Sequence, residues 1–186
     1  KNGVCIINLD DERIPSYVIN LSCKKITCSM TNSQADIFIK EYTVSNDTYD
    51  IQASIFGEVY SYSIPVIGNH NLFNSVMAIA SIIADGLEPK EFLKNTANIR
   101  NYKGRFSSQK ITPNLTLVDD TYNASATAVK AAIEDLAEFD GKKILVISSM
   151  RELGDEAQNY HTQMGQWIAK ANLDKVFLFG DEDDLD

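Results

Sequence analysis

The chain is poor in the residue types that metal centres and disulfide scaffolds require. Its 186 residues include only 3 Cys, 2 His and 1 Trp, and no two cysteines are spaced as Cys-x-x-Cys. Such sites need clustered cysteine or histidine side chains. We therefore expect no metal ligands in this chain, and we expect Cys5, Cys23 and Cys28 to be buried or half-buried thiols in a reducing compartment.

Positive charge and long apolar runs are also scarce. The chain has 17 Lys and Arg against 26 Asp and Glu, which gives a net charge of −9. General nucleic-acid binding needs clustered cations that displace counterions, so this composition argues against a nucleic-acid partner. No apolar stretch approaches the ~18 residues needed to cross a bilayer, and no signal-peptide pattern opens the chain. We expect a folded, cytoplasmic, monomeric protein without membrane contact.

One phosphate-binding motif is missing altogether. No stretch of the form Gly-x-x-x-x-Gly-Lys-Ser/Thr occurs in the sequence. That loop cradles nucleotide phosphates with backbone N–H groups, so any nucleotide site formed here must use other groups. The start at Lys1, directly before a strand-like run from Gly3 to Asn8, is typical of a chain that begins inside a domain.

The first half of the sequence predicts short strands followed by helices. Two helices are predicted, one from about Asn71 to Ala84, ended by Gly86, and a short one from Pro89 to Ala97. Turn residues between the last three of the expected strands indicate an antiparallel meander. The expected strands are Val4 to Asn8, Ser16 to Leu21, Ile26 to Ser29, Asp36 to Val44, Thr48 to Phe56 and Glu58 to Ile64.

Beyond Arg105 the pattern changes to alternating strands and helices. Alternation of this kind predicts right-handed crossovers and a parallel sheet that is buried on both faces. The fold class is therefore α/β, and the change of pattern between Asn98 and Phe106 indicates a boundary between two domains. An apolar run extends from Ile111 to Val118. The expected elements are a strand from Leu115 to Asp119, a helix from Ala126 to Phe139, a strand from Lys143 to Ser148, a helix from Glu156 to Ala171 and a strand from Val176 to Phe179.

Polar residues gather at the start of the first long helix. His70, Asn71 and Asn74 follow Gly68, and the two asparagines are three residues apart. Side chains at this spacing project from the same side of a helix, where an amide can bond to the edge of a base. His70 lies close to the backbone donors of the helix N-terminus. We expect these three residues to contact a nucleotide base.

Two further polar clusters flank the apolar strand of the second half. Arg105 follows Gly104, and its planar, permanently charged fork suits phosphate oxygens. At the carboxyl end of the strand, where ligands bind in α/β sheets, Asp120 is expected to accept from ribose hydroxyls and Tyr122 to pack its ring on the nucleotide. Asn123 is expected to cap the following helix or contact substrate.

Taken in order, these clusters resemble the Mur ligase family. The resemblance runs from Asn8 to Gly180. It includes Glu152, in the loop that follows the Lys143 strand, and His161, on the next helix. The sequence departs from the family at Ser125, where Asn is usual, and at Ser148 and Ser149, where Gly-Asp is usual. The matching motifs are Gly-Asn-His-Asn-Leu-Phe-Asn at 68–74, Lys-Gly-Arg-Phe at 103–106, Asp-Asp-Thr-Tyr-Asn-Ala-Ser at 119–125 and Met-Arg-Glu-Leu-Gly at 150–154.

The resemblance implies an ATP-dependent amide ligase of bacterial cell-wall synthesis. Residues 1–104 would be the later part of the central ATP-binding domain, and residues 105–186 the first part of a Rossmann-like C-terminal domain. The phosphate loop, the modified lysine and the Mg²⁺ ligands would lie upstream, so the chain alone would be inactive. Arg105 would act on the ATP phosphates, and Glu152 with Asn123 would meet substrate. His161 would brace the loop that carries Glu152.

The pattern is most similar to family members that add D-alanyl-D-alanine to UDP-N-acetylmuramoyl-tripeptide. Two alternatives share parts of it. Another amino-acid ligase of the Mur and folylpolyglutamate superfamily would share the fold and the His-Asn cluster, although the run around Tyr122 and the Glu-Leu-Gly run favour the dipeptide adder. A non-enzymatic Rossmann-like interaction module would lack the phosphate loop by design.

Overall fold

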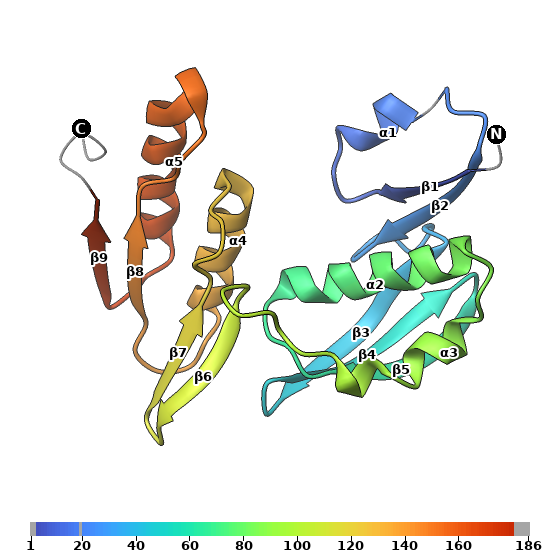
Figure 1. The fold of residues 1–186 in the computed structure, drawn as a ribbon, viewed down its shortest axis with the longest axis horizontal. Helices are drawn as coiled ribbons and strands as arrows, with labels where there is room; N and C mark the ends of the chain where they lie inside the picture. The colour runs from blue at the N-terminus through green and yellow to red at the C-terminus, as the bar shows by residue number, and fades with distance from the viewer. Residues whose placement is uncertain (1–2, 19, 181–186) are drawn as a thin grey trace. The chain divides into compact units, whose positions relative to one another are not determined.

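The computed structural model describes residues 3–18 and 20–180 (Figure 1). The chain divides between Asn101 and Tyr102 into two compact units. The first unit comprises residues 1–101 and the second unit residues 102–186. Both combine helices with strands, and the α/β class predicted from the sequence is confirmed. The acidic run from Asp181 to Asp186 lies outside the described residues.

The first unit is built on a five-stranded sheet with the order β1-β2-β3-β4-β5. The pairs β1–β2 and β2–β3 are parallel, whereas β3–β4 and β4–β5 are antiparallel. The predicted antiparallel meander is therefore confirmed for the last three strands. The strand bounds are Val4–Asn8 for β1, Lys24–Ser29 for β2, Ile37–Ser45 for β3, Thr48–Ile55 for β4 and Glu58–Ile64 for β5.

Helix α2 (Asn69–Ala84) covers one face of this sheet (Figure 1). Leu72, Val76 and Ile79 are 0% exposed and recur at the helical period, so one stripe of the helix lies entirely in the core. Burying each such side chain stabilises the fold by about 1.5–3 kcal/mol. The helix ends before Gly86, whose φ of 85° is the left-handed conformation that glycine adopts at least cost. The core thereby fixes the start of α2, where the predicted base contacts lie.

The helix that follows α2 is shorter than predicted. Helix α3 spans Pro89–Leu93, and a separate 3-10 turn, η1, spans Thr96–Asn98. The predicted helix from Pro89 to Ala97 is therefore broken after Leu93. Asn95 Nδ2 donates to the carbonyl of Glu91 at 3.1 Å, and Asn side chains that bond to nearby backbone favour turns over continued helix.

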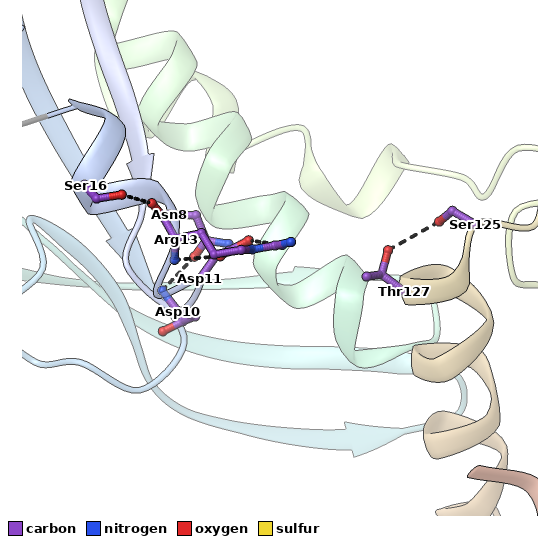
Figure 2. A network of polar contacts seen from close by, with 7 residues as sticks. All are labelled: Asn8, Asp10, Asp11, Arg13, Ser16, Ser125 and Thr127. Atoms are coloured by element: carbon purple, nitrogen blue, oxygen red, sulfur yellow. Dashed lines mark hydrogen bonds and ion pairs between the residues drawn. The ribbon is translucent and has the colours of Figure 1, made fainter. Parts of the chain in front are cut away.

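One predicted strand of the first unit is wrong. Residues Ile14–Val18 form helix α1, where a strand from Ser16 to Leu21 was expected. Proline fits the first turn of a helix, and the Ser16 hydroxyl donates to the Arg13 carbonyl at 2.7 Å (Figure 2). The Asp11 carboxylate accepts from the backbone N–H and guanidinium of Arg13, and these bonds lower the pKa of Asp11 to about 2. These local bonds favour a helical turn where the sequence suggested a strand.

The second unit begins with an antiparallel hairpin. Strand β6 (Ser107–Thr112) pairs with β7 (Leu115–Asp119), and Pro113 and Asn114 form the turn. The strand predicted from Leu115 to Asp119 is confirmed as β7. The apolar run from Ile111 to Val118 is not one continuous strand, because Pro113 removes a backbone donor and Asn114 favours a turn. The polar character of Ser107 to Lys110 hid the first strand of the hairpin.

The rest of the second unit alternates helices with strands. Strands β8 and β9 are parallel neighbours, as predicted, but β7 pairs only with β6 among the described residues. The expectation that β7 would join the same parallel sheet is thus not met. The bounds are Ala126–Ala137 for α4, Ile144–Ser148 for β8, Gly154–Glu156 for the turn η2, Ala157–Lys170 for α5 and Lys175–Phe179 for β9.

The parallel pair β8–β9 is covered by the core of its unit on one face only. Leu145 and Ile147 pack against a cluster that includes Ile133, Met150 and Met164. Ile144 and Val146, which alternate with them, are 52% and 61% exposed. The expectation of a sheet buried on both faces is therefore wrong for these strands within the described residues.

Cys28 in β2 is expected to resist thiol reagents. Cys28 is fully buried, and its pKa is raised to about 12. Burial is the main cause, and the negative charges of Asp36 and Asp10 add to it. Because the thiolate is the reacting form, we expect Cys5 and Cys23, both half-buried, to react first with Ellman's reagent at pH 8. Two thiols should titrate in the folded chain and all three in denaturant. Rapid reaction of all three without denaturant would contradict the burial of Cys28, and Cys28→Ser should remove only the protected thiol.

In the described part of the chain, no helix combines the length and the apolar character that crossing a bilayer requires.

Candidate functional site

The first candidate cluster lies at the start of α2. Gly68 precedes the helix with φ 94°, and its carbonyl accepts from the Asn71 N–H at 2.9 Å. Asn69 begins the helix and accepts from the Tyr49 hydroxyl of β4 at 3.5 Å. His70 and Asn71 are half-buried, and Asn74 is exposed. His70, Asn71 and Asn74, the three residues predicted to contact a base, therefore lie together in the first turns of α2.

The two asparagine amides lie within reach of one another. Asn74 Nδ2 donates to Asn71 Oδ1 at 3.4 Å, and Asn71 Nδ2 donates to the Ile67 carbonyl at 2.6 Å. An amide has two N–H donors and an acceptor with two lone pairs, so each of these bonds leaves further capacity for a ligand. The bond to Ile67 also fixes the Asn71 side chain against the segment that leads into the helix. This geometry suits recognition of a base edge, which presents adjacent donors and acceptors.

The second candidate cluster lies at the start of the second unit, where two turns are bonded to each other. Tyr122 N–H donates to the Gly104 carbonyl at 3.0 Å, and Phe106 N–H donates to Asp120 Oδ1 at 2.9 Å. Phe106 is 3% exposed and has φ 50°, a conformation that costs of order 1–3 kcal/mol for residues other than glycine. The Asp120 bond and the burial of its ring hold Phe106 in place, which fixes the neighbouring Arg105.

Gly104 is required by this close approach. Its φ is 75°, and a Cβ atom added there would lie 3.2 Å from both the Cβ and the N atoms of Tyr122. The group that comes close to the Gly104 backbone is Tyr122. No sequence signal pointed to the left-handed conformation of Phe106.

Arg105 projects from this turn over an aromatic ring. Its Cζ atom lies 4.0 Å from the centroid of the Tyr122 ring. Within the described residues, its guanidinium forms no ion pair with a carboxylate. The side chain is exposed. Its N–H donors are therefore available to an anion, as phosphate recognition requires.

The two adjacent aspartates have different surroundings. Asp119 Oδ1 accepts from the Thr121 hydroxyl at 2.7 Å and from the Thr121 N–H at 3.2 Å, and these bonds hold the pKa of the Asp119 carboxyl below its usual range. Asp120 uses Oδ1 for Phe106, while its Oδ2 has no bond among the described residues. Each carboxylate therefore keeps its Oδ2 as an acceptor among the described residues, and the ribose contact of Asp120 remains a prediction.

Ser125 caps helix α4, a role that serine commonly has before a helix. Its hydroxyl accepts from the Ala128 N–H at 3.3 Å and lies 3.3 Å from the Thr127 hydroxyl (Figure 2). Asn123 is exposed, and its Oδ1 accepts from the Ala124 N–H at 3.0 Å. Asn123 therefore does not cap the helix, and its predicted contact with substrate remains a prediction.

His161 braces the loop after β8. Its Nε2 accepts from the Met150 N–H at 2.9 Å, which confirms the predicted bracing role and requires the imidazole to be unprotonated at that atom. Met150 is 4% exposed, so this bond joins His161 to a buried residue at the start of the loop. Glu152 follows with φ 61° and an exposed side chain. The Glu152 side chain is therefore exposed, and the start of its loop is fixed by the bond between His161 and Met150.

The predicted site residues fall into both units. His70, Asn71 and Asn74 belong to the first, whereas Arg105, Asp120, Tyr122, Asn123 and Glu152 belong to the second. Within the second unit, the structure brings Arg105, Asp120 and Tyr122 together. The described residues contain no group of three or more His, Cys, Asp or Glu side chains suited to a metal ion.

Comparison with known proteins explains this combination of clusters. The description "Mur ligase middle domain" matches residues 1–82, and "Mur ligase, glutamate ligase domain" matches residues 104–186. The chain belongs to the Mur ligase family. The family resemblance drawn from the motifs is thereby confirmed, and the two matched regions contain both candidate clusters.

Similar proteins carry one name. The chain is 32% identical to the UDP-N-acetylmuramoyl-tripeptide–D-alanyl-D-alanine ligase of Haemophilus influenzae, over 98% of this chain and 39% of that protein. It is 34% identical to the ligase of the same name from Bacillus subtilis, over 97% of this chain and 38% of that protein. This chain thus spans about two fifths of the length of these curated relatives.

Solved structures agree with the fold. MurF from Acinetobacter baumannii superposes with a TM-score of 0.87 at 25% identity, covering 97% of this chain and 39% of that chain. MurF from Thermotoga maritima, solved in complex with ADP, superposes with a TM-score of 0.81 at 23% identity, covering 97% and 41%. The latter identity supports the shared fold alone.

Proposed function

We propose that the chain is part of an ATP-dependent ligase that adds D-alanyl-D-alanine to UDP-N-acetylmuramoyl-tripeptide. Residues 1–104 would be the later part of its central ATP-binding domain, and residues 105–186 the first part of its Rossmann-like C-terminal domain. The observation that carries the proposal is the Arg105 guanidinium, which is exposed and unpaired by carboxylates within the described residues. The names of the similar proteins supply the substrates.

The proposed reaction has two steps. A carboxylate oxygen of the tripeptide attacks the γ-phosphorus of ATP, which forms an acyl phosphate and releases ADP. The amine of D-alanyl-D-alanine then attacks the acyl carbon through a tetrahedral intermediate, and inorganic phosphate leaves with the bonding electron pair. In both steps negative charge accumulates on phosphoryl oxygens. A positioned guanidinium stabilises that charge, because its fork matches two oxygens at once.

The adenosine part of ATP would be held by the remaining predicted residues. His70, Asn71 and Asn74 contact the base, and Asp120 Oδ2 accepts from a ribose hydroxyl. The amides of Asn71 and Asn74 retain donors and acceptors, and Asp120 retains one carboxylate oxygen, which supports these contacts. The ADP complex of the Thermotoga maritima MurF is consistent with a nucleotide as ligand.

The peptide substrates would meet the outward-facing groups of the second unit. Asn123 and Glu152 are both exposed, and each belongs to a segment whose backbone is fixed by neighbouring bonds. We assign them to UDP-N-acetylmuramoyl-tripeptide or to the incoming dipeptide. We also propose a cytoplasmic location, because ATP and a UDP-linked substrate are cytoplasmic metabolites. We further propose that the protein is a monomer. Size-exclusion chromatography with light scattering tests the monomer.

The decisive assay uses the complete protein that contains this chain. ADP release should require UDP-N-acetylmuramoyl-tripeptide, and amide product should require D-alanyl-D-alanine in addition. Replacing the dipeptide by single amino acids or by glutamate should abolish product. Product formed with glutamate on a folate acceptor, and none with the dipeptide, would instead identify another amino-acid ligase of the superfamily.

Residues 1–186 alone are expected to bind ATP weakly. The chain contains base, ribose and phosphate-contacting side chains but no Gly-x-x-x-x-Gly-Lys-Ser/Thr loop. Few contacts survive the cost of association, so calorimetry should give a Kd no tighter than roughly 1 mM. Micromolar binding in the presence of Mg²⁺ would contradict this assignment of contacts.

A further inference from the structure

Tyr122 supports Arg105 through the face of its ring. The Arg105 Cζ atom lies 4.0 Å from the ring centroid, well inside the ~6 Å within which a cation is attracted by an aromatic face. Both side chains are exposed, Tyr122 to 63%. An exposed arginine has many rotamers of similar energy, so a contact of this kind selects one of them.

An aromatic ring is a suitable partner for an arginine that must bind an anion. A carboxylate partner would occupy guanidinium N–H donors and neutralise the charge. A ring attracts the guanidinium through its π face and leaves the N–H donors at the edge of the fork unused. The absence of an Arg105 ion pair within the described residues agrees with this arrangement.

The backbone fixes the ring beneath the guanidinium. Tyr122 N–H donates to the Gly104 carbonyl at 3.0 Å, and Arg105 N–H donates to the Tyr102 carbonyl at 3.0 Å. The Tyr102 ring meets the Tyr122 ring edge-on, with centroids 6.5 Å apart. The residues that carry the ring and the guanidinium are thus joined by bonds that do not depend on either side chain.

We propose that Tyr122 is a positioning residue that acts through Arg105, holding the guanidinium in the orientation in which it meets the phosphates. This inference rests on the proposed function, in which Arg105 contacts the ATP phosphates. It replaces the expectation that the Tyr122 ring packs directly on the nucleotide. One face of the ring is occupied by Arg105, and the contribution of Tyr122 to ATP use passes through that residue.

The test is a double-mutant cycle in the complete ligase, with kcat/KM for ATP as readout. Tyr122→Leu, which keeps apolar bulk but has no π face, should lower kcat/KM about 2- to 30-fold, the range expected from the strength of cation–π contacts. Tyr122→Phe keeps the ring and should stay within about twofold of the parent, given that the phenol is not needed for the π face. In an Arg105→Ala background, Tyr122→Leu should cause no further loss.

A structural readout accompanies the kinetics. In nuclear magnetic resonance spectra of residues 1–186, the side-chain protons of Arg105 should be shifted upfield by the ring current in the parent and in Tyr122→Phe. They should return to ordinary positions in Tyr122→Leu. Tyr17→Leu, at a tyrosine that is 80% exposed in the first unit, serves as the matched control and should change neither readout.

The outcomes separate the two proposals. A full additional loss from Tyr122→Leu in the Arg105→Ala background would show direct contact between Tyr122 and the nucleotide and would overturn the positioning role alone. Parent-like kinetics of Tyr122→Leu, with Arg105→Ala impaired, would also overturn it. Parent-like kinetics of Arg105→Ala would overturn the proposed function of Arg105 and the positioning role with it.

Discussion

Replacing Arg105 by Ala in the complete ligase is expected to lower kcat by about 10²- to 10³-fold, the usual effect of removing one positioned donor. The physical reason is that charge accumulates on phosphoryl oxygens in both steps of the proposed reaction. Arg105 is exposed and forms no ion pair within the described residues, so its removal should leave folding nearly unchanged. Steady-state kinetics with saturating substrates, together with a thermal melt, measure the two effects separately.

Two further variants sharpen this prediction. Arg105→Lys keeps the charge but loses the planar fork, so it should recover only part of the rate. Arg13→Ala is the matched control, since Arg13 is an exposed arginine of the first unit that pairs with Asp11. It should retain parent activity. An Arg105→Ala enzyme with unchanged kcat would show that Arg105 is an ordinary surface residue.

Replacing Leu72 by Ala is expected to destabilise the first unit by about 2–5 kcal/mol, the range for truncating a buried leucine. Leu72 is 0% exposed and lies in α2 between Asn71 and Asn74. The cavity it leaves would remove the support beneath the predicted base contacts. Urea denaturation of residues 1–186, followed by peptide-resolved hydrogen exchange over α2 and β3 to β5, measures the loss.

The exposed Leu87 provides the matched control. It is 54% exposed, and Leu87→Ala should change the free energy of unfolding by less than about 0.5 kcal/mol, as is usual for surface substitutions. Trp167, the single tryptophan of the chain, lies in α5 of the second unit. Its fluorescence reports whether that unit keeps its stability in the Leu72→Ala variant. Equal destabilisation by the two leucine substitutions would contradict the position of Leu72 in the core.

The elements with strong periodicity could be predicted from the sequence alone. The buried stripe of α2 repeats with the helical period, and turn residues separate β3, β4 and β5, so a local pattern was enough to predict them. Family membership followed from short motifs at fixed places, including the His-Asn cluster and the Gly104-Arg105 pair. The capping role of Ser125 was also readable, because capping depends on one side chain and the next three residues.

Other features depended on hydrogen bonds that the apolar pattern does not report. Local bonds among residues 11–16 accompany helix α1, where a strand was expected. Pairing with β7 makes β6 a strand although its own sequence is mostly polar. The exposed face of β8 was likewise unpredictable, because a short apolar run does not state which face has a partner.

The arrangement around Arg105 was decided only by tertiary structure. Phe106 adopts a left-handed conformation that its own side chain disfavours, and it does so because Asp120, 14 residues later, accepts its N–H. The same crossing brings Tyr122 against Gly104 and beneath the guanidinium. The sequence named the residues that a phosphate site would use, since charge and planarity are properties of single side chains. Their mutual orientation depends on contacts between segments that are apart in the sequence, and a local sequence pattern does not predict such contacts.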